Sequence, residues 1–198
     1  MRHLVIMAKQ PMAGQVKSRL AKDIGNIGAA GFYRTLMTTT MTRLSRDERW
    51  KTFAAVTPDR AVFSHNWPEG INVFGQGSGD LGARLQSIFN VMPPGPPSGP
   101  VIIIGTDIPF ITRTDIARAF KLLGPNDVIL GGAGDGGYWL VGAKRSPRVP
   151  EIFGNIRWSG KHALADTLEN CRGLKVGFTV ERFDVDTMAD YLRWREEL

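Results

Sequence analysis

The stretch that decides the fold class runs from residue 101 to residue 109 and reads Val101-Ile102-Ile103-Ile104-Gly105-Thr106-Asp107-Ile108-Pro109. Its first four residues are apolar and rich in β-branched side chains, a pattern typical of a buried strand. Ligands of open parallel sheets bind just beyond the carboxyl ends of the strands, which is where Asp107 falls. A carboxylate on a turn that Pro109 stiffens suits a hard cation such as Mg²⁺. A simple turn or N-cap aspartate is the alternative that these residues leave open.

Strand-like and helix-like segments alternate along the rest of the chain. Strands are expected at residues 3–7, 51–56, 71–74, 101–104, 127–130 and 138–141. Helices are expected at residues 28–46, 81–92, 116–123, 161–171 and 187–197. This alternation predicts an α/β protein, a three-layer α/β/α sandwich around a mostly parallel sheet. A proline-rich run at 93–100 predicts a rigid loop that is short for a domain linker, so we expect residues 1–198 to form one domain.

Composition narrows the class of protein and the class of ligand. The 198 residues carry a formal net charge of +6, with a pI near 9.8, which favours anionic ligands such as phosphorylated small molecules. No dense basic run lies beside an array of aromatic residues, so nucleic acid is not the expected partner. The one cysteine, Cys171, excludes an internal disulfide and a cysteine-cluster metal site. Without a membrane-length apolar run or a signal peptide, a cytoplasmic location is expected.

The loop after the first strand is basic and leads toward a helix. Gly14 permits close backbone approach, and the N–H groups at a helix start attract anions. Lys9, Lys17 and Arg19 are therefore expected to surround a polyphosphate. The loop matches neither the Walker A pattern nor the dinucleotide-binding glycine pattern. A solvated basic loop is the alternative reading.

Two later segments add carboxylates. The glycine-rich run at 131–138 contains Asp135, followed by Gly136 and Gly137, and its lack of side-chain bulk lets a ligand approach closely. Near the C-terminus, Asp184 and Asp186 alternate on a segment expected to be extended, so their side chains point to the same side. The pair is suited to chelating one divalent ion or bridging two. Alternatively, Asp186 or Thr187 caps the last helix; the two readings are compatible.

In combination and in order, these segments resemble a known family. They are the basic first loop, the run at 76–84 that contains GDLG at 79–82, GTDIP at 105–109, DGGYW at 135–139, IRWS at 156–159 and DVDT at 184–187. The family is a group of bacterial glycosyltransferase-like proteins with the GT-A, nucleotide-diphospho-sugar transferase fold. The first loop, with KSRL at 17–20, is also similar to that of the phospholactate guanylyltransferases, which are GT-A nucleotidyltransferases.

The resemblance implies a Rossmann-like sheet that binds a nucleotide across its first half. It implies that the first loop holds base and phosphates, with Lys9, Gly14, Lys17 and Arg19 as contacts. Asp107 matches the metal-binding position of the GT-A Asp-x-Asp motif, here reduced to Gly105-Thr106-Asp107, and Asp184 and Asp186 match a later metal-binding pair.

The function expected from these residues is transfer from a nucleotide-diphospho-sugar donor to a small-molecule acceptor, with Mg²⁺ or Mn²⁺ held by Asp107, Asp184 and Asp186. Lys17 and Arg19 would stabilise charge on the phosphates, and Asp135 would position or deprotonate an acceptor hydroxyl, with Gly136 and Gly137 beside the ligand. The alternatives are a nucleotidyltransferase that releases pyrophosphate and a non-catalytic nucleotide-binding protein. The base, sugar, acceptor and oligomeric state stay open.

Overall fold

The strand predicted from the decisive stretch lies at the centre of a seven-stranded sheet. In the computed structural model, which describes residues 1–91 and 99–197, β4 (Val101–Gly105) pairs in parallel with β1 (His3–Lys9) and antiparallel with β6 (Tyr138–Ala143). The strand order is β3-β2-β1-β4-β6-β5-β7. The remaining strands are β2 (Lys51–Thr57), β3 (Asn72–Gly75), β5 (Val128–Gly132) and β7 (Val176–Phe178).

The sheet is mostly parallel, as predicted, and β6 runs against its neighbours. The connection between β5 and β6 covers only residues 133–137, which is too short for the crossover that a parallel pair needs. The two strands therefore form a hairpin, and β6 enters the sheet antiparallel to both β5 and β4. The glycine-rich segment at 131–138 is the turn of this hairpin.

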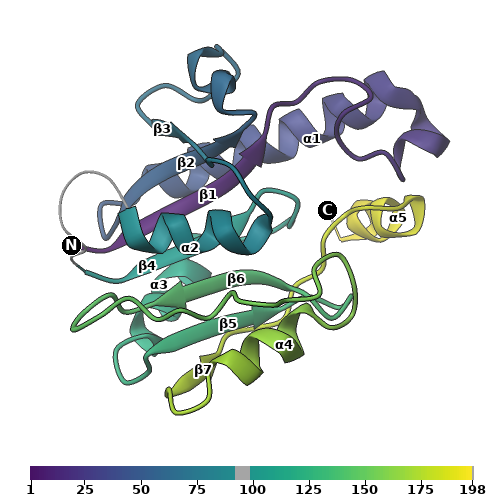
Figure 1. Ribbon diagram of the computed structural model, residues 1–198. Helices are drawn as coiled ribbons and strands as arrows, with labels where there is room; N and C mark the ends of the chain where they lie inside the picture. The colour runs from purple at the N-terminus through teal and green to yellow at the C-terminus, as the bar shows by residue number, and fades with distance from the viewer. Residues whose placement is uncertain (92–98, 198) are drawn as a thin grey trace.

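Helices cover both faces of the sheet and give the predicted three layers (Figure 1). The helices are α1 (Ala21–Ser45), α2 (Leu81–Val91), α3 (Arg113–Leu122), α4 (Ala163–Asn170) and α5 (Met188–Glu196). α1 and α3 pack on one face, and α2 and α4 pack on the other. Successive side chains of a strand point to opposite faces of the sheet. Ile102 and Ile104 of β4 therefore enter the core under α1 and α3, while Val101 and Ile103 enter the core under α2 and α4.

The structure differs from the predicted elements in two places. α1 begins at Ala21 rather than near residue 28, because two helical pieces join across Gly25, whose φ of 76° is not helical. β7 was not predicted. It is only three residues long and lies at the edge of the sheet, where its pairing with β5 defines it as a strand. Of the proline-rich loop predicted at 93–100, residues 93–98 lie outside the described residues.

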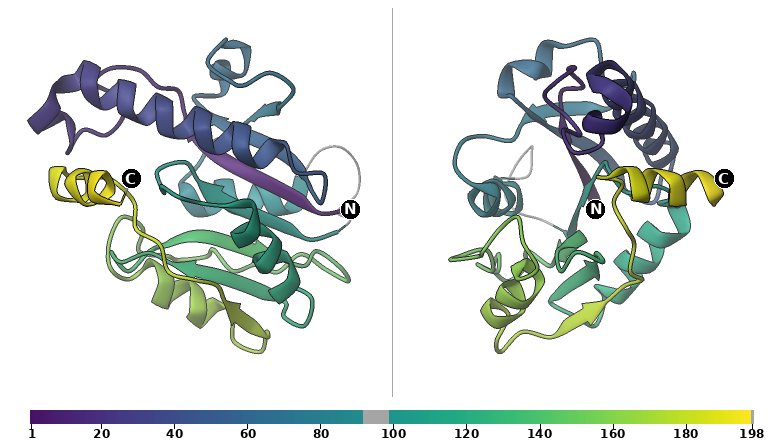
Figure 2. Two further views of the ribbon diagram at one scale, coloured as in Figure 1. Left: turned by 180° about the vertical axis from the view of Figure 1, so that it is seen from behind. Right: turned by 90° about the vertical axis from the view of Figure 1, so that its right-hand side faces the viewer.

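The C-terminal helix is attached to the start of α1 through aromatic side chains. Phe32 of α1 contacts Tyr191 and Trp194 of α5 at ring-centroid distances of 5.2 and 5.0 Å, and Tyr191 and Trp194 lie 5.4 Å apart. Thr187 begins α5 with a capping box, in which Asp190 Oδ2 accepts from the Thr187 backbone N–H at 2.8 Å. Figure 2 shows α5 beside the N-terminal half of α1, away from the main body of the sheet. No residue of α5 is buried; the aromatic contacts, the cap and the Arg193 guanidinium, which lies 3.8 Å from the centroid of the Phe183 ring, orient it.

No helix within the described ranges combines the length and the apolar character that a membrane span requires.

We predict that Trp194→Ala frees α5 without unfolding the sheet. Aromatic pairs of this kind stabilise by about 0.5–1.5 kcal/mol each, so the variant should lose roughly 1–2 kcal/mol in its free energy of unfolding at most. Amide hydrogen exchange over residues 188–196 should accelerate while exchange in β1 and β4 stays slow. Leu192→Ala, on the same helix and outside the aromatic contacts, is the matched control. Equal exchange rates in α5 of the two variants would contradict the prediction.

Candidate functional site

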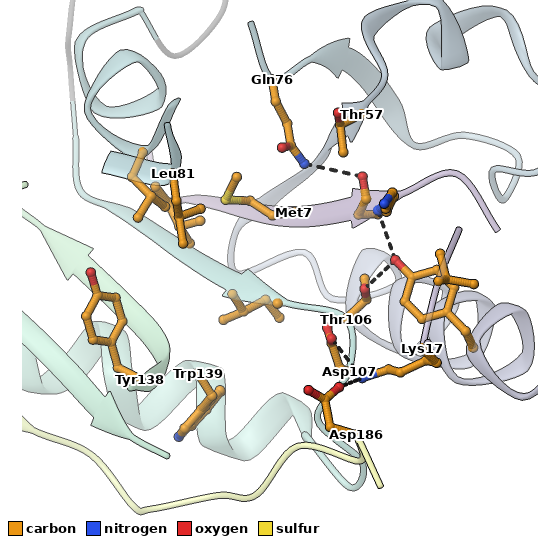
Figure 3. Close-up of a pocket in the computed structure, with 18 of the residues that line it drawn as sticks. Met7, Lys17, Thr57, Gln76, Leu81, Thr106, Asp107, Tyr138, Trp139 and Asp186 are labelled. Atoms are coloured by element: carbon orange, nitrogen blue, oxygen red, sulfur yellow. Dashed lines mark hydrogen bonds and ion pairs between the residues drawn. The ribbon is translucent and has the colours of Figure 1, made fainter. Parts of the chain in front are cut away.

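A cavity of about 610 Å³ opens at the carboxyl ends of β1 and β4. Its volume lies within the range usual for small-molecule sites, about 300–1,000 Å³. Its walls come from the first loop, the ends of these two strands, the start of α2, the inner part of β6 and the segment before α5. Figure 3 shows that Lys17, Asp107 and Asp186 meet at one end of this cavity.

One lysine joins two carboxylates from distant parts of the chain. Lys17 Nζ lies 2.9 Å from Asp107 Oδ2 and 2.7 Å from Asp186 Oδ1. The Lys17 side chain is 3% exposed, whereas the carboxylates are 41% and 38% exposed. Burial by itself would lower the pKa of Lys17, but the attraction of Asp107 and then of Asp186 outweighs burial and raises that pKa. The ammonium is therefore held charged where it meets both carboxylates.

The first loop is fixed by apolar anchors on both sides of Lys17. Val16 and Leu20 are buried in the core, so the loop cannot swing freely into solvent. Gly14 (φ 76°) and Lys17 (φ 51°) both adopt left-handed backbone conformations. For Gly14 this costs little, but for lysine it is an uncommon conformation that persists where the surroundings demand it. From this turn the buried Lys17 side chain reaches Asp107 and Asp186 at the cavity.

Tyr33 of α1 ties the walls of the site together and was not among the predicted residues. Its hydroxyl accepts from the Lys9 backbone N–H at 2.9 Å and shares a hydrogen bond of 3.0 Å with Thr106 Oγ1. Burial, followed by the nearby Asp107 carboxylate, raises the pKa of Tyr33 to about 12, so the phenol stays neutral. A tyrosine within the apolar stripe of a predicted helix is a usable signal, since a buried hydroxyl needs partners.

The segment before α5 reaches the site through backbone hydrogen bonds. The buried Val185 donates its backbone N–H to the Asp107 carbonyl oxygen at 3.1 Å, which brings Asp186 next to Lys17. The Asp186 N–H in turn donates to Asp190 Oδ2 at 3.2 Å. Thr187, rather than Asp186, is the cap of the last helix, so Asp186 keeps its carboxylate free for the site.

The residues present fit a divalent cation. Asp107 and Asp186 supply the carboxylate oxygens that Mg²⁺ and Mn²⁺ prefer, and they already hold a cationic group, the Lys17 ammonium, between them. Burial, then the Asp186 charge, raises the pKa of Asp184. Among the described residues no three acidic, histidine or cysteine side chains form a preassembled metal-ligand group, so Asp184 is not gathered with Asp107 and Asp186. A three-carboxylate metal site remains a prediction.

The other predicted phosphate contacts divide into two sets. Lys9, Lys17 and Arg19 all line the cavity, and Arg19 Nη1 lies 3.7 Å from Asp186 Oδ2 with its side chain 71% exposed. Gly14 is not among the lining residues; it shapes the turn that precedes Lys17.

Asp135, Gly136 and Gly137 form the tip of the hairpin rather than a wall of the cavity. Asp135 Oδ1 accepts from the Gly137 N–H at 2.9 Å and so caps the turn. A Cβ built on Gly136 would lie 2.5 Å from the Lys161 carbonyl oxygen, so this glycine serves a close backbone contact with the segment before α4. None of the three belongs to the described cavity lining. Asp135 is nevertheless near enough to Asp184 for its charge to help raise the pKa of Asp184.

Gln76 is a second lining residue that the sequence did not single out. It is buried, and its Nε2 donates to the Ala55 carbonyl oxygen at 2.9 Å and to the Ala8 carbonyl oxygen at 3.3 Å. These bonds hold the amide at the ends of β1 and β2. A glutamine directly after a strand gives no periodic signal, which is why only the folded chain identifies it.

Several solved structures have the same fold. A protein from Desulfovibrio desulfuricans G20, described as a nucleotide-diphospho-sugar transferase, is 28% identical with a TM-score of 0.86, over 96% of this chain and 84% of that one. A nucleotidyl transferase from Methanothermobacter is 13% identical with a TM-score of 0.60, over 100% and 97% of the two chains. Rv0371c from Mycobacterium tuberculosis, solved in complex with manganese, is 15% identical with a TM-score of 0.56, over 98% and 97%. The last two similarities concern the fold alone.

The expected GT-A, nucleotide-diphospho-sugar transferase fold is thereby confirmed. No curated protein matches this chain in sequence. Residues 40–160 match the model of DUF2064, described as an uncharacterized protein conserved in bacteria. Since that match spans more than half of the sequence, the chain belongs to the DUF2064 family.

Proposed function

We propose that this protein is a metal-dependent transferase that uses a nucleotide-diphospho-sugar or a nucleoside triphosphate as donor. The observation that carries the proposal is the meeting of Lys17, Asp107 and Asp186 at the carboxyl ends of β1 and β4. A buried cation paired with two partly open carboxylates is suited to a diphosphate and its counter-ion. The similarity to a nucleotide-diphospho-sugar transferase and to a manganese complex of the same fold supports the donor class and the metal.

In this proposal each residue has a stated task. Asp107 and Asp186 hold Mg²⁺ or Mn²⁺, which supplies charge neutralisation at the diphosphate when bound, and Asp184 is the candidate for a third ligand. Lys17 and Arg19 bind the phosphate oxygens where negative charge develops on the leaving group. Lys9 adds a further positive charge at the cavity wall.

Asp135 is proposed to orient the acceptor or to remove its proton. The hairpin tip lies near Asp184, and the glycines around Asp135 leave little bulk to obstruct an acceptor. A small-molecule acceptor is expected rather than nucleic acid, because the positive charge of the site lies within a cavity.

Two reaction types use the same parts. In glycosyl transfer, the acceptor attacks the anomeric carbon of the donor sugar and a nucleoside diphosphate leaves. In nucleotidyl transfer, the acceptor attacks the α-phosphorus of a triphosphate and pyrophosphate leaves; the nucleotidyl transferase among the solved neighbours favours this second candidate. Products from labelled nucleotide-sugars and labelled triphosphates, incubated with Mn²⁺ and candidate acceptors, distinguish the two. Tight donor binding without any product would instead support a non-catalytic nucleotide-binding protein.

We predict that Asp107→Asn and Asp186→Asn each weaken Mn²⁺ binding by at least about tenfold, because each removes a charged oxygen ligand. Asp184→Asn is expected to weaken it as well, by a smaller factor. Mn²⁺ titration followed by electron paramagnetic resonance measures these affinities directly. Asp23→Asn, on the exposed first turn of α1, is the control. The metal assignment fails if the site variants bind Mn²⁺ as tightly as the control does.

Lys17→Ala and Arg19→Ala are expected to weaken binding of a nucleoside triphosphate in the presence of Mg²⁺ but to differ in their effect on stability. Arg19 is largely exposed, so its loss should leave the unfolding free energy nearly unchanged. Lys17 is buried, and its loss leaves two carboxylates without their shared partner. Breaking a fully buried pair costs about 3–5 kcal/mol, and the exposure of both carboxylates to water reduces the expected loss to roughly 1–2 kcal/mol. Calorimetric titration measures the affinity, and chemical denaturation measures the stability. Unchanged triphosphate affinity in both variants would exclude Lys17 and Arg19 from donor binding.

We predict that Asp135→Asn lowers the single-turnover rate by roughly 10²–10⁴, the usual contribution of a positioned base. The asparagine Oδ1 still accepts from the Gly137 N–H, so the turn and the donor affinity should persist. Donor affinity and rate are measured on the same preparation. A near-normal rate would show that Asp135 only caps the turn. A fall in metal affinity would identify Asp135 as a metal ligand.

A further inference from the structure

The cavity has two chemically different ends. Figure 3 shows Lys17, Asp107 and Asp186 on one side and Met7, Leu81 and Tyr138 on the other. We refer to the second side as the apolar compartment. It consists of Leu81 and of the cavity-lining residues that pack in one apolar cluster: Met7, Leu85, Ile103, Tyr138 and Val141.

The aromatic side chain at this end is that of Tyr138, whose hydroxyl is engaged with α4. It accepts from Thr167 Oγ1 at 3.3 Å. What Tyr138 offers a ligand is therefore chiefly the hydrocarbon of its ring. A ring held by its polar tip is also fixed in orientation, so this surface is largely formed before a ligand arrives.

The backbone behind the compartment offers no hydrogen bonds either. Met7 and Ile103 belong to β1 and β4, and Val141 belongs to β6. Each of these three strands has a hydrogen-bonded neighbour on both sides, so its N–H and C=O groups are used within the sheet. Hydroxyl groups of a sugar or polyol placed against these strands would lose water without gaining backbone partners. A hydrocarbon group has no hydrogen bonds to water to lose, and its transfer out of water is favourable in free energy.

We propose that the apolar compartment binds the aryl or branched-alkyl body of the acceptor, whose anionic group faces the cationic end of the same cavity. The inference rests on the proposed transferase function, which it deepens by naming the acceptor class. The acceptor is thus a small amphipathic molecule rather than a polyol. Leu81, 42% exposed at the rim, is the residue of this surface that a substitution reaches without disturbing the core.

The first test compares two phosphate monoesters that share an anionic group and differ in body. Phenyl phosphate and glucose 1-phosphate are titrated calorimetrically into the full chain with Mg²⁺. Phenyl phosphate is expected to bind at least about tenfold more tightly. Equal affinities, or tighter binding of glucose 1-phosphate, would overturn the proposal.

Two variants of α2 test whether a preference for phenyl phosphate arises in the apolar compartment. Leu81→Asn is expected to reduce phenyl phosphate affinity about tenfold and to leave glucose 1-phosphate affinity unchanged. Val91→Asn is the matched control, because Val91 is 63% exposed on the same helix and does not line the cavity. A preference for phenyl phosphate that survives equally in both variants would come from elsewhere on the protein and would refute the proposal.

The alternative occupant of the apolar compartment is the nucleobase of the donor, which is also flat and largely apolar on its faces. Uridine and guanosine, which lack phosphate, are added to the phenyl phosphate complex. Retained phenyl phosphate binding supports an acceptor compartment, and competitive displacement by either nucleoside overturns it. A separate titration with nucleotide-sugars and nucleoside triphosphates tests the proposed function. Its failure alongside a retained phenyl phosphate preference would refute the donor class and leave the compartment standing.

Discussion

The interaction on which the site depends is the shared contact of one ammonium group with two carboxylates. The buried Lys17 is held by Asp107 and Asp186, and this contact joins the first loop, the end of the central strand and the segment before α5. Each carboxylate alone would be an ordinary partly exposed acid. Their common partner turns three segments into one charged centre, because an ammonium buried this deeply requires charged neighbours.

The sheet makes this contact possible by bringing distant parts of the chain to one edge. β1 and β4 are parallel neighbours, so their carboxyl ends and the loops that follow them lie together. Tyr33 then connects the end of β1 to the loop after β4 through its hydroxyl group. The Val185 hydrogen bond to Asp107 adds the third segment through main-chain geometry, which does not depend on the identity of its side chain. The site is therefore supported by backbone and by a neutral phenol, and its charges meet on a rigid frame.

Sequence patterns predicted the parts of the site that follow from single strands and their ends. Asp107 was predicted because four apolar residues and a stiff turn mark the end of a buried strand, and the three layers followed from the alternation of strands and helices. The contact of Lys17 with Asp186 spans 169 residues and depends on register and on a hydrogen bond from Val185, which no local pattern contains. Gly136 shows the opposite case: its glycine-rich surroundings are typical of a ligand loop, yet the folded chain uses its missing side chain for contact with Lys161. Gln76 was noted only as the first residue of the run at 76–84 and was given no role, because one polar residue after a strand has no periodicity.

The position of Asp186 in the chain has a consequence for how the protein is made. Translation produces the central sheet and the first loop well before residue 186, so a nascent chain has its cavity walls while the second carboxylate is still missing. The charged centre is completed only when the segment that contains Asp186 has been made, and α5 then holds that segment through the contacts of Phe32 with Tyr191 and Trp194. A product of premature termination between Phe178 and Asp186 retains most of the apolar core yet lacks half of the carboxylate pair. During synthesis, this protein therefore has the residues of its fold before it has all the residues of its charged centre.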